Sequence, residues 1–412
     1  MRTNNAQNRP ARLTRRIVAS LAILVIVGAL LTWLFVFRSS GSTDTGQNSD
    51  KPQKNQQSTQ NNNDVIRFIA TGDMLPHDTV NQAARRADGS YDYRQFFSQV
   101  RPYMKADVSF CNQESPSSPN FAVSGYPTFN APSAFASDLS AEGCNLINLA
   151  NNHADDKGQA GINDTLDVWS KLPTLAVAGT AKSASQQQKI AYFTVKNVRF
   201  AFLSYAQCSN NTAVSSYGLN IFSQQFALRQ INEAKQNADV IIAAMHSCVE
   251  DKNTPDSWQT GATKFFADNG VSIVIGTGPH WLQPVQQLAR GGGGQTLVWY
   301  SLGNFLSTQL DVNGMIGGIA VMDIDTKTKS VTDFGFLPTY MHYEWTAQQK
   351  ASEDLLARHN LMIYPLDKAA EPLARSQLDT TVEAQSRRVT DLMTSDGAPV
   401  KIYTSQSYPL WQ

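Results

Sequence analysis

The chain of 412 residues has no excess charge of either sign, because 34 lysines and arginines balance 34 acidic residues. This balance gives no indication of nucleic-acid binding, which usually requires a basic surface. The chain lacks a Gly-x-Ser-x-Gly motif, so the common signature of a serine hydrolase is absent. It also lacks internal repeats. A chain of this length can instead bury a large core in one or two domains.

Charge is missing altogether from one run near the start, "IVASLAILVIVGALLTWLFVF" at residues 17–37. A helix of this length spans about 30 Å, the thickness of the bilayer hydrocarbon. Residues 1–16 carry five arginines and no acid, which predicts a basic cytoplasmic N-terminus. No Ala-x-Ala site follows the run, so an uncleaved transmembrane signal anchor is favoured over a cleaved signal peptide. Residues 38–63 lack large apolar side chains and predict a disordered linker.

From residue 64 onward, short apolar runs alternate with stretches of helical apolar spacing. This alternation predicts an α/β layered domain at 64–345, with largely parallel strands and helices on its faces. The later strands lack helices between them, which predicts a second, more antiparallel sheet packed on the first. Amphipathic segments at 347–360 and 384–393 predict that 346–412 is a helical extension packed on the domain.

Polar side chains of the kinds that bind ligands follow six of the predicted strands. In open sheets, ligands bind beyond the carboxyl ends of the strands. The residues at these ends are Asp73, His77, Glu114, Asn151, Asn152, His153, His246, Glu250, His280 and Asn304. Independent histidines would scatter over helices and loops as well, so four of six at strand ends indicate one shared polar site. Carboxylate, imidazole and amide groups are ligands of divalent metals, so the site is predicted to bind one.

Nine motifs strengthen this interpretation by their order and spacing. They are "TGDMLPHD", "NQESPSS", "YPTFNAP", "INLANNHADDKGQAGINDT", "VAGTAKS", "FAFLSYA", "MHSCVE", "GTGPHWLQPV" and "YSLGNFLSTQ". Over about residues 64–310 the chain resembles the bacterial capsule-synthesis CapA family of poly-γ-glutamate biosynthesis proteins. The fold of that family is similar to the calcineurin-like metallophosphoesterases, so the resemblance implies two packed sheets flanked by helices.

The resemblance also implies roles for individual residues. The implied metal ligands are Asp73, Glu114, Asn152, His246 and His280, with Glu114 a candidate bridge between two ions and His77 a further candidate ligand. His153 corresponds to a histidine that protonates a leaving group or binds a phosphoryl oxygen. Asp155 or Asp156 would orient His153, or would cap the helix after Gly158 instead. Asn151, Glu250 and Asn304 would line the site. The implied cofactor is Mn, Fe or Zn, as one ion or two.

Two departures from the family pattern concern the metal. The family reads Gly-x-His-Pro-His where this chain reads "GTGPH", so Gly278 stands at an expected ligand position. The family reads His-Trp-Gly-x-Glu where this chain reads "HSCVE". The loss of one imidazole should weaken a second metal position unless His77, Glu250 or Cys248 compensates. Two ions, one ion and none are therefore all open.

The four cysteines divide into two pairs by position. Cys208 and Cys248 end two strands that could be neighbours, so they form either a disulfide or two buried thiols. Cys111 and Cys144 lie within predicted strands and are interpreted as core residues.

The leading hypothesis is a membrane-anchored, extracytoplasmic CapA-type protein in the synthesis or export of an anionic surface polymer. A metal-dependent hydrolase acting on a phosphoryl or acyl centre is one form of it. The first alternative is a non-catalytic scaffold or polymer-binding subunit with a degenerate metal site, and the second is an unrelated phosphodiesterase. The expected partners are the membrane, polymer synthase or export proteins and the polymer itself, with no nucleic acid.

Overall fold

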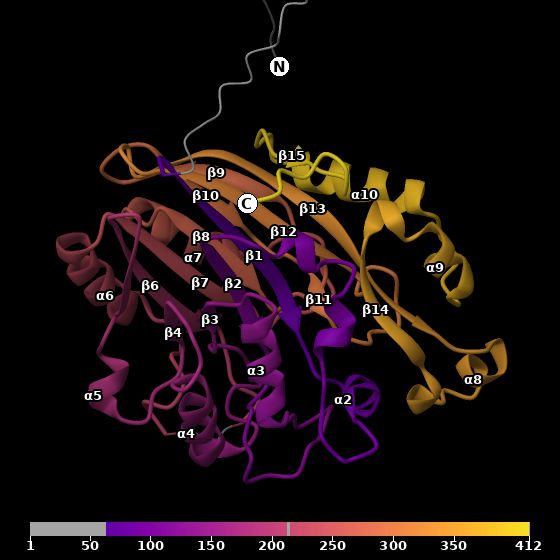
Figure 1. Ribbon diagram of the computed structural model, residues 1–412. Coiled ribbons are helices and arrows are strands. Elements are labelled where there is room, and N and C mark those ends of the chain that lie inside the picture. The colour runs from indigo at the N-terminus through magenta and orange to yellow at the C-terminus, as the bar shows by residue number, and fades with distance from the viewer. Residues whose placement is uncertain (1–62, 212–214, 412) are drawn as a thin grey trace, which may run out of the picture. The chain divides into compact units, whose positions relative to one another are not determined.

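A nine-stranded and a six-stranded β-sheet form the centre of the computed structural model, which describes residues 63–211 and 215–411 (Figure 1). The predicted α/β fold with two sheets is confirmed at this level. Within the described residues, no helix combines the length and apolar character needed to cross a membrane. The predicted signal anchor at 17–37 and residues 38–62 of the predicted linker lie outside the described residues.

The nine-stranded sheet contains the first and the last strands of the domain. Its path runs through β14 (His359–Pro365), β13 (Ser330–Glu344), β12 (Ile316–Asp325), β1 (Val65–Met74), β2 (Val108–Gln113), β3 (Leu146–Asn148) and β4 (Ala176–Ala178). Off this path, β11 (Asn304–Leu306) pairs with β1, and β15 (Lys401–Ile402) pairs with β13. Strands β1 to β4 are parallel, whereas β12, β13 and β14 are antiparallel to their neighbours on this path, and β15 is parallel to β13.

The six-stranded sheet is built from the middle of the sequence. Its spatial order is β5 (Ala191–Val195), β6 (Val198–Ala206), β7 (Val240–His246), β8 (Ile273–Thr277), β10 (Gln295–Trp299) and β9 (Val285–Ala289). The central pairs β6–β7, β7–β8 and β8–β10 are parallel, and the two edge strands are antiparallel. The second sheet is therefore mainly parallel.

The prediction that the later strands form a separate antiparallel sheet is wrong. Strand β12 pairs with β1, in a register from Val65 opposite Asp325 to Thr71 opposite Ile319, and thus extends the first sheet. Pairing between segments so far apart in the chain leaves no local signal in either of them. The absence of predicted helices between these strands correctly indicates antiparallel connections, but it does not indicate which sheet the strands join.

Helices cover the outer faces and edges of the two sheets (Figure 1). The α-helices are α2 (Asp78–Ala84), α3 (Ser133–Ala141), α4 (Gly158–Trp169), α5 (Ala184–Gln187), α6 (Gln224–Asn237), α7 (Ser257–Asp268), α8 (Ala347–Ala351), α9 (Ala370–Arg375) and α10 (Val382–Thr394). Short 3₁₀ turns are η1 (Arg94–Phe97), η2 (Arg101–Tyr103), η3 (Leu355–Ala357) and η4 (Leu366–Lys368). Helix α7 begins with a capping box, in which Asp256 and Gln259 bond to each other's backbone N–H groups.

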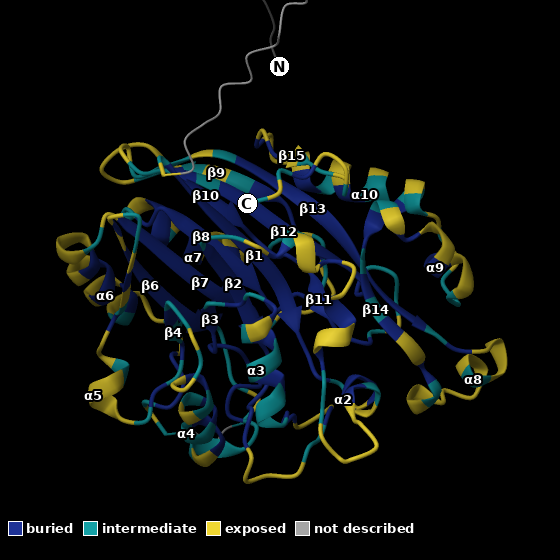
Figure 2. Cartoon of the chain, in the orientation of Figure 1, coloured by how far each residue is buried: buried dark blue, intermediate teal, exposed yellow. Residues whose placement is uncertain are grey.

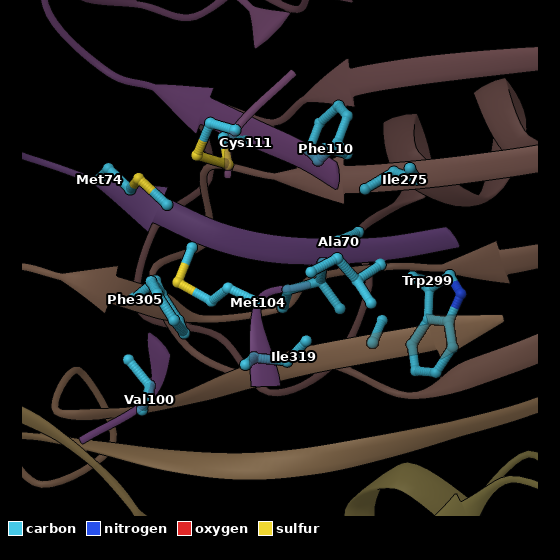
Figure 3. Packing of buried hydrophobic residues seen from close by; sticks show 14 of the residues in the cluster. Ala70, Met74, Val100, Met104, Phe110, Cys111, Ile275, Trp299, Phe305 and Ile319 are labelled. Atoms are coloured by element: carbon cyan, nitrogen blue, oxygen red, sulfur yellow. A yellow bond between two sulfur atoms is a disulfide. The ribbon is translucent and has the colours of Figure 1, made fainter. Parts of the chain in front are cut away.

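The main core fills the space between the sheets. Phe110 of β2 meets Phe202 of β6 with ring centroids 6.1 Å apart, and Trp299 of β10 lies 6.1 Å from Phe336 of β13. Figure 3 shows Phe110, Ile275 and Trp299 in this cluster. The central strands are buried, while the helices expose their outer faces (Figure 2). All ten residues of β1 are buried, because the strand lies in the middle of its sheet and is covered on both faces.

The C-terminal segment is less helical than predicted. The stretch 347–360 contains the five-residue helix α8 and the turn η3, and it then enters strand β14. Helix α10, by contrast, covers the second predicted helix at 384–393. Strands β14 and β15 hydrogen-bond to β13, so the segment 346–412 contributes strands to the nine-stranded sheet as well as helices.

Both pairs of cysteines are joined. The Cys208–Cys248 disulfide, one of two open alternatives, is present. The interpretation of Cys111 and Cys144 as unpaired core residues is wrong, because they form a second disulfide. Cys111 lies on β2 and Cys144 lies just before β3, the neighbouring strand. Both residues are 1% exposed. A buried cysteine in an apolar run has the same sequence pattern whether it is a free thiol or part of a disulfide.

Reduction of the Cys208–Cys248 bond should lower the free energy of unfolding by about 2–4 kcal/mol, because the unfolded chain gains conformational entropy when the cross-link is absent. Denaturant unfolding of the Cys208→Ser, Cys248→Ser double variant against the wild type measures this. Peptide mapping without reductant should find Cys111 linked to Cys144 and Cys208 linked to Cys248. Free thiols in the unreduced protein would contradict both assignments.

Candidate metal centre

Side chains from both sheets meet where the parallel strands end. Asp73 lies near the end of β1, Glu114 directly follows β2, and His246 is the last residue of β7. Ligand atoms of these three residues all lie within 4.8 Å of one another. Asp73 and Glu114 are completely buried and His246 is 1% exposed. The structure thus brings together three predicted ligands that are about 170 residues apart in the chain.

His280 reaches the same cluster from the loop after β8. Its Nδ1 lies 3.1 Å from Asp73 Oδ2, and its Nε2 lies 3.9 Å from Glu114 Oε1. Burial alone would lower the pKa of His280, but the carboxylates of Glu114 and Asp73 raise it to about 10. Burial would raise the pKa of Asp73, but the hydrogen bond and charge of His280 hold it below its ordinary value. These two residues therefore form a buried ion pair.

Glu114 has one carboxylate oxygen without a hydrogen-bond partner. Its Oε2 accepts a hydrogen bond from Asn112 Nδ2 at 3.2 Å, whereas Oε1 is buried and has no partner among the described residues. Oε1 lies 3.6 Å from His246 Nε2. Burial and the charge of Asp73 raise the pKa of Glu114 well above its ordinary value. A buried oxygen without a donor costs about 1–3 kcal/mol, and a cation bound beside it would remove this cost.

The donor set around that oxygen fits a divalent cation. Once His280 releases its proton, the cluster offers two carboxylates and two imidazoles, which are ligands that Mn, Fe and Zn accept in proteins. His246 Nδ1 lies 2.9 Å from Thr277 Oγ1, and Nε2 lies 2.9 Å from Asn152 Oδ1. Burial lowers the pKa of His246 to about 3, so its ring is neutral. The amide oxygen of Asn152 only accepts, so in this structure the neutral ring donates Nε2–H to Asn152 and Nδ1 accepts from Thr277. Because the Thr277 hydroxyl can also accept, the ring proton can move to Nδ1, and Nε2 would then be available to a metal.

His153 lies beside the cluster in contact with Phe129, their ring centroids being 4.6 Å apart. Its Nδ1 is 2.8 Å from Asp156 Oδ2, which also accepts the backbone N–H of Phe129 at 2.6 Å. Asp156 is therefore the aspartate that orients His153. Helix α4, which begins at Gly158, has no side-chain cap, so the alternative of a capping aspartate is wrong.

Asp155, the other aspartate predicted as a possible partner of His153, has different partners. Both of its carboxylate oxygens accept the Ser209 hydroxyl at 2.9 Å, and its backbone oxygen accepts a hydrogen bond from Asn211. Burial raises the pKa of Asp155 to about 6. The predicted catalytic role of Asp155 is corrected accordingly, since its side chain holds the loop at 209–211.

His77 and Glu250 lie near the cluster without joining its hydrogen bonds. His77 Nδ1 accepts the backbone N–H of Thr308 at 3.2 Å, and burial lowers the pKa of His77 to about 3. Its ring is 5.5 Å from that of Phe129. The Glu250 side chain is 48% exposed, and its Oε1 is 4.0 Å from His280 Nε2. Glu250 therefore stands at the edge of the site, and His77 is held beside it by the backbone.

Asn151 and Asn304 support the backbone around the site. Asn151 donates to the carbonyl of Gln113 at 2.8 Å and accepts the backbone N–H of His153. Asn304 donates to the carbonyl of Gly314 at 2.9 Å and is paired in register with Asp73. These hydrogen bonds fix the strand ends that present the ligands.

Gly278 leaves no room for a side chain at the expected ligand position. Its φ of +100° is rarely adopted by other residues, and its N–H donates to Asp73 Oδ2 at 3.1 Å. A Cβ here would lie 2.0 Å from the Ser247 carbonyl oxygen and 3.0 Å from His246 Nε2. Cys248 cannot substitute as a ligand, since it is bonded to Cys208. The residues present therefore fit one cation better than two.

Sequence reasoning missed Asn112 and Thr277. Asn112 donates to both Asp73 and Glu114, and Thr277 bonds to His246. The signal for Asn112 was a polar residue inside an apolar strand, two positions before Glu114. Such a buried amide needs hydrogen-bond partners, and it could have been placed beside the site for that reason.

The chain matches a known protein family over the region that carries this cluster. The family model described as "Bacterial capsule synthesis protein PGA_cap" matches residues 67–309, a segment that contains all of the strand-end residues described above. The match covers more than half of the chain, so the chain belongs to the PGA_cap family of bacterial capsule synthesis proteins. The resemblance to the CapA family is thereby confirmed.

Two characterised relatives carry the CapA name. The PGA biosynthesis protein CapA of Bacillus subtilis (strain 168) is 32% identical over 168 residues, which are 40% of this chain and 43% of that protein. The capsule biosynthesis protein CapA of Bacillus anthracis is 27% identical over 260 residues, or 60% of this chain and 61% of that protein. The chain thus spans less than two thirds of either relative. A solved phosphatase structure from Mycoplasma pneumoniae is similar at a TM-score of 0.40 and 13% identity, covering 66% of this chain and 93% of that one.

Gly278→Ala should lower the free energy of unfolding by more than about 3 kcal/mol, because backbone strain adds to a direct clash with Ser247. The matched control is Gly292→Ala in the β9–β10 hairpin. Gly292 also has a positive φ, of +89°, but a Cβ there would meet no atom within 4 Å. The control should lose about 1–2 kcal/mol from strain alone. Equal losses in denaturant unfolding would contradict the crowding at position 278.

Proposed function

We propose that this chain acts in the synthesis or export of an anionic cell-surface polymer, and that its cluster of buried acids and histidines holds one Mn, Fe or Zn ion. The observation that carries the metal proposal is the unpartnered Oε1 of Glu114, which lies between His246 and His280 at 3.6 and 3.9 Å. Family membership supports the polymer, for which poly-γ-glutamate is the candidate named by the relative from Bacillus subtilis.

The proposed ligands are Asp73, Glu114, His246 and His280, with Asn152 able to contribute its amide oxygen. These residues would hold a divalent ion, and the chemistry it would supply is activation of a water and polarisation of a phosphoryl or acyl oxygen. His153 donates Nδ1–H to Asp156, which leaves Nε2 to exchange a proton with a substrate. Gly278 and the buried walls keep the carboxylates in a fixed arrangement. A metallophosphoesterase-like hydrolysis is the reaction that these residues support best.

The location that we propose is extracytoplasmic, with residues 17–37 as a membrane anchor and 38–63 as a tether. Two disulfides support this, since such bonds persist in oxidising compartments and are rare in the cytosol of most bacteria. Polymer synthase or export proteins in the membrane would be the partners.

A second candidate is a non-catalytic scaffold that binds polymer or synthase through the same site. The Gly278 N–H favours it, because a backbone donor fills the side of Asp73 where a further imidazole was expected. An unrelated phosphodiesterase would hydrolyse small phosphodiesters without affecting the capsule.

Elemental analysis and turnover of a generic phosphodiester by the full-length protein test the enzyme proposal. We expect stoichiometric metal in the wild type and its loss in Glu114→Gln, a replacement of nearly the same shape. This variant should keep the thermal stability of the metal-free protein, because burial and Asp73 raise the pKa of Glu114 and favour its uncharged form, which glutamine resembles. The matched control, Glu250→Gln, changes a half-exposed carboxyl and should retain the metal. A metal-free wild type that binds polymer would favour the scaffold instead.

Asp156→Asn should reduce phosphodiester turnover about 100-fold or more, because His153 loses its orienting carboxylate. Asp155→Asn is the matched control. It changes the neighbouring aspartate, which bonds to Ser209, and should leave turnover within a few-fold of the wild type. Steady-state kinetics at saturating metal decides between them. Equal effects of the two substitutions would contradict the assignment of Asp156.

A further inference from the structure

Three buried polar side chains lie behind the proposed metal ligands. Asn112 on β2 and Asn148 on β3 are completely buried, and Ser204 on β6 is 1% exposed. Burying an amide without hydrogen bonds costs several kcal/mol, so polar groups in a strand interior need partners. The three side chains satisfy one another.

Their hydrogen bonds form one continuous chain that ends at the two acids. The Ser204 hydroxyl donates to Asn148 Oδ1, and Asn148 Nδ2 donates to Asn112 Oδ1 at 2.8 Å. Asn112 Nδ2 then donates to Asp73 Oδ1 at 2.8 Å and to Glu114 Oε2 at 3.2 Å. Asp73, paired with His280, is the ionised acid and only accepts, so it fixes the direction of every donor before it.

The strand register explains how these residues meet. Asn148 is opposite Asn112 in the β2–β3 pair, and Asn112 is opposite Asp73 in the β1–β2 pair. Side chains at one level of adjacent parallel strands lie next to each other on the same face. Ser204 joins this row from the facing sheet, where β6 pairs with β7, the strand that ends at His246.

The Asn112 amide has two hydrogens, one for each acid, and this determines which oxygen of Glu114 is left without a donor. One N–H is used by Asp73 and the other by Oε2 of Glu114, so the oxygen left over is Oε1, the one facing the two histidines. The row of hydrogen-bonded side chains therefore leaves Oε1 of Glu114 available and holds the carboxyl groups of Asp73 and Glu114 side by side. It also connects the sheet that carries the acids to the sheet that carries His246 and His280.

We propose that Asn112, Asn148 and Ser204 are positioning residues that aim Glu114 Oε1 and Asp73 at the metal position. This rests on the proposed metal site and adds residues to it that touch neither metal nor substrate. The effect should decrease with distance along the row. Asn112→Leu removes both donors to the acids, Asn148→Leu removes the support of Asn112, and Ser204→Ala removes one hydroxyl at the far end.

Titration of the purified, metal-free full-length protein with Co²⁺, followed by the visible d–d absorption, tests the proposal. We expect Asn112→Leu to lower the Co²⁺ affinity about 10- to 100-fold and to alter the band shape. Asn148→Leu should lower the affinity less, and Ser204→Ala about 2- to 5-fold. The band shape reports ligand geometry, which a purely structural loss would leave unchanged.

The matched control is Gln230→Leu, which removes a buried amide on α6 that accepts a hydrogen bond from Tyr205 of β6. It should lower thermal stability and leave Co²⁺ affinity and spectrum unchanged. If Asn112→Leu does not fold, Ser204→Ala tests the positioning role instead, because it removes only one oxygen atom and is the smallest change in the row. Wild-type affinity and spectrum in every folded variant would overturn the positioning role alone. A wild type that binds no Co²⁺ would overturn the proposed metal site itself.

Discussion

The burial of two carboxylates side by side is the constraint on which the rest of the site depends. Asp73 and Glu114 are both completely buried, and each raises the free energy of ionising the other. Asp73 is stabilised by His280, Gly278 and Asn112, whereas Glu114 keeps one oxygen without a donor. A fold that needed only stability would place apolar side chains here. The arrangement supports the proposed cation site.

The two-sheet construction allows these groups to converge. The acids come from the ends of parallel strands in the nine-stranded sheet, and the histidines come from the ends of parallel strands in the six-stranded sheet. Because the sheets pack through one apolar core, strand ends from both reach the same region. Asn148 and Ser204 connect the sheets by a polar contact just behind the ligands. The geometry of the site is thus coupled to the packing of the whole domain.

Sequence reasoning predicted the convergence of ligands well, because the rule about carboxyl ends of strands needs no knowledge of pairing. It failed where the role of a residue depends on a displacement of a few ångströms in the fold. Asp155 and Asp156 are adjacent in a turn, and the sequence cannot show that only the second faces His153. It also failed on long-range register, which places β12 beside β1 and Asn148 beside Asn112. The Cys111–Cys144 bond depends on the same information.

Gly278 limits how many metal ions the proposed site can hold. Its N–H donates to Asp73, and the Ser247 carbonyl oxygen lies where the Cβ of any side chain at position 278 would be. A two-metal clamp stabilises both the attacking and the leaving oxygen, whereas a single ion leaves part of that task to protein groups. His153, oriented by Asp156 beside the cluster, is placed to supply the missing part as a proton donor. For the proposed hydrolase, one ion in place of two would therefore increase the dependence of turnover on His153.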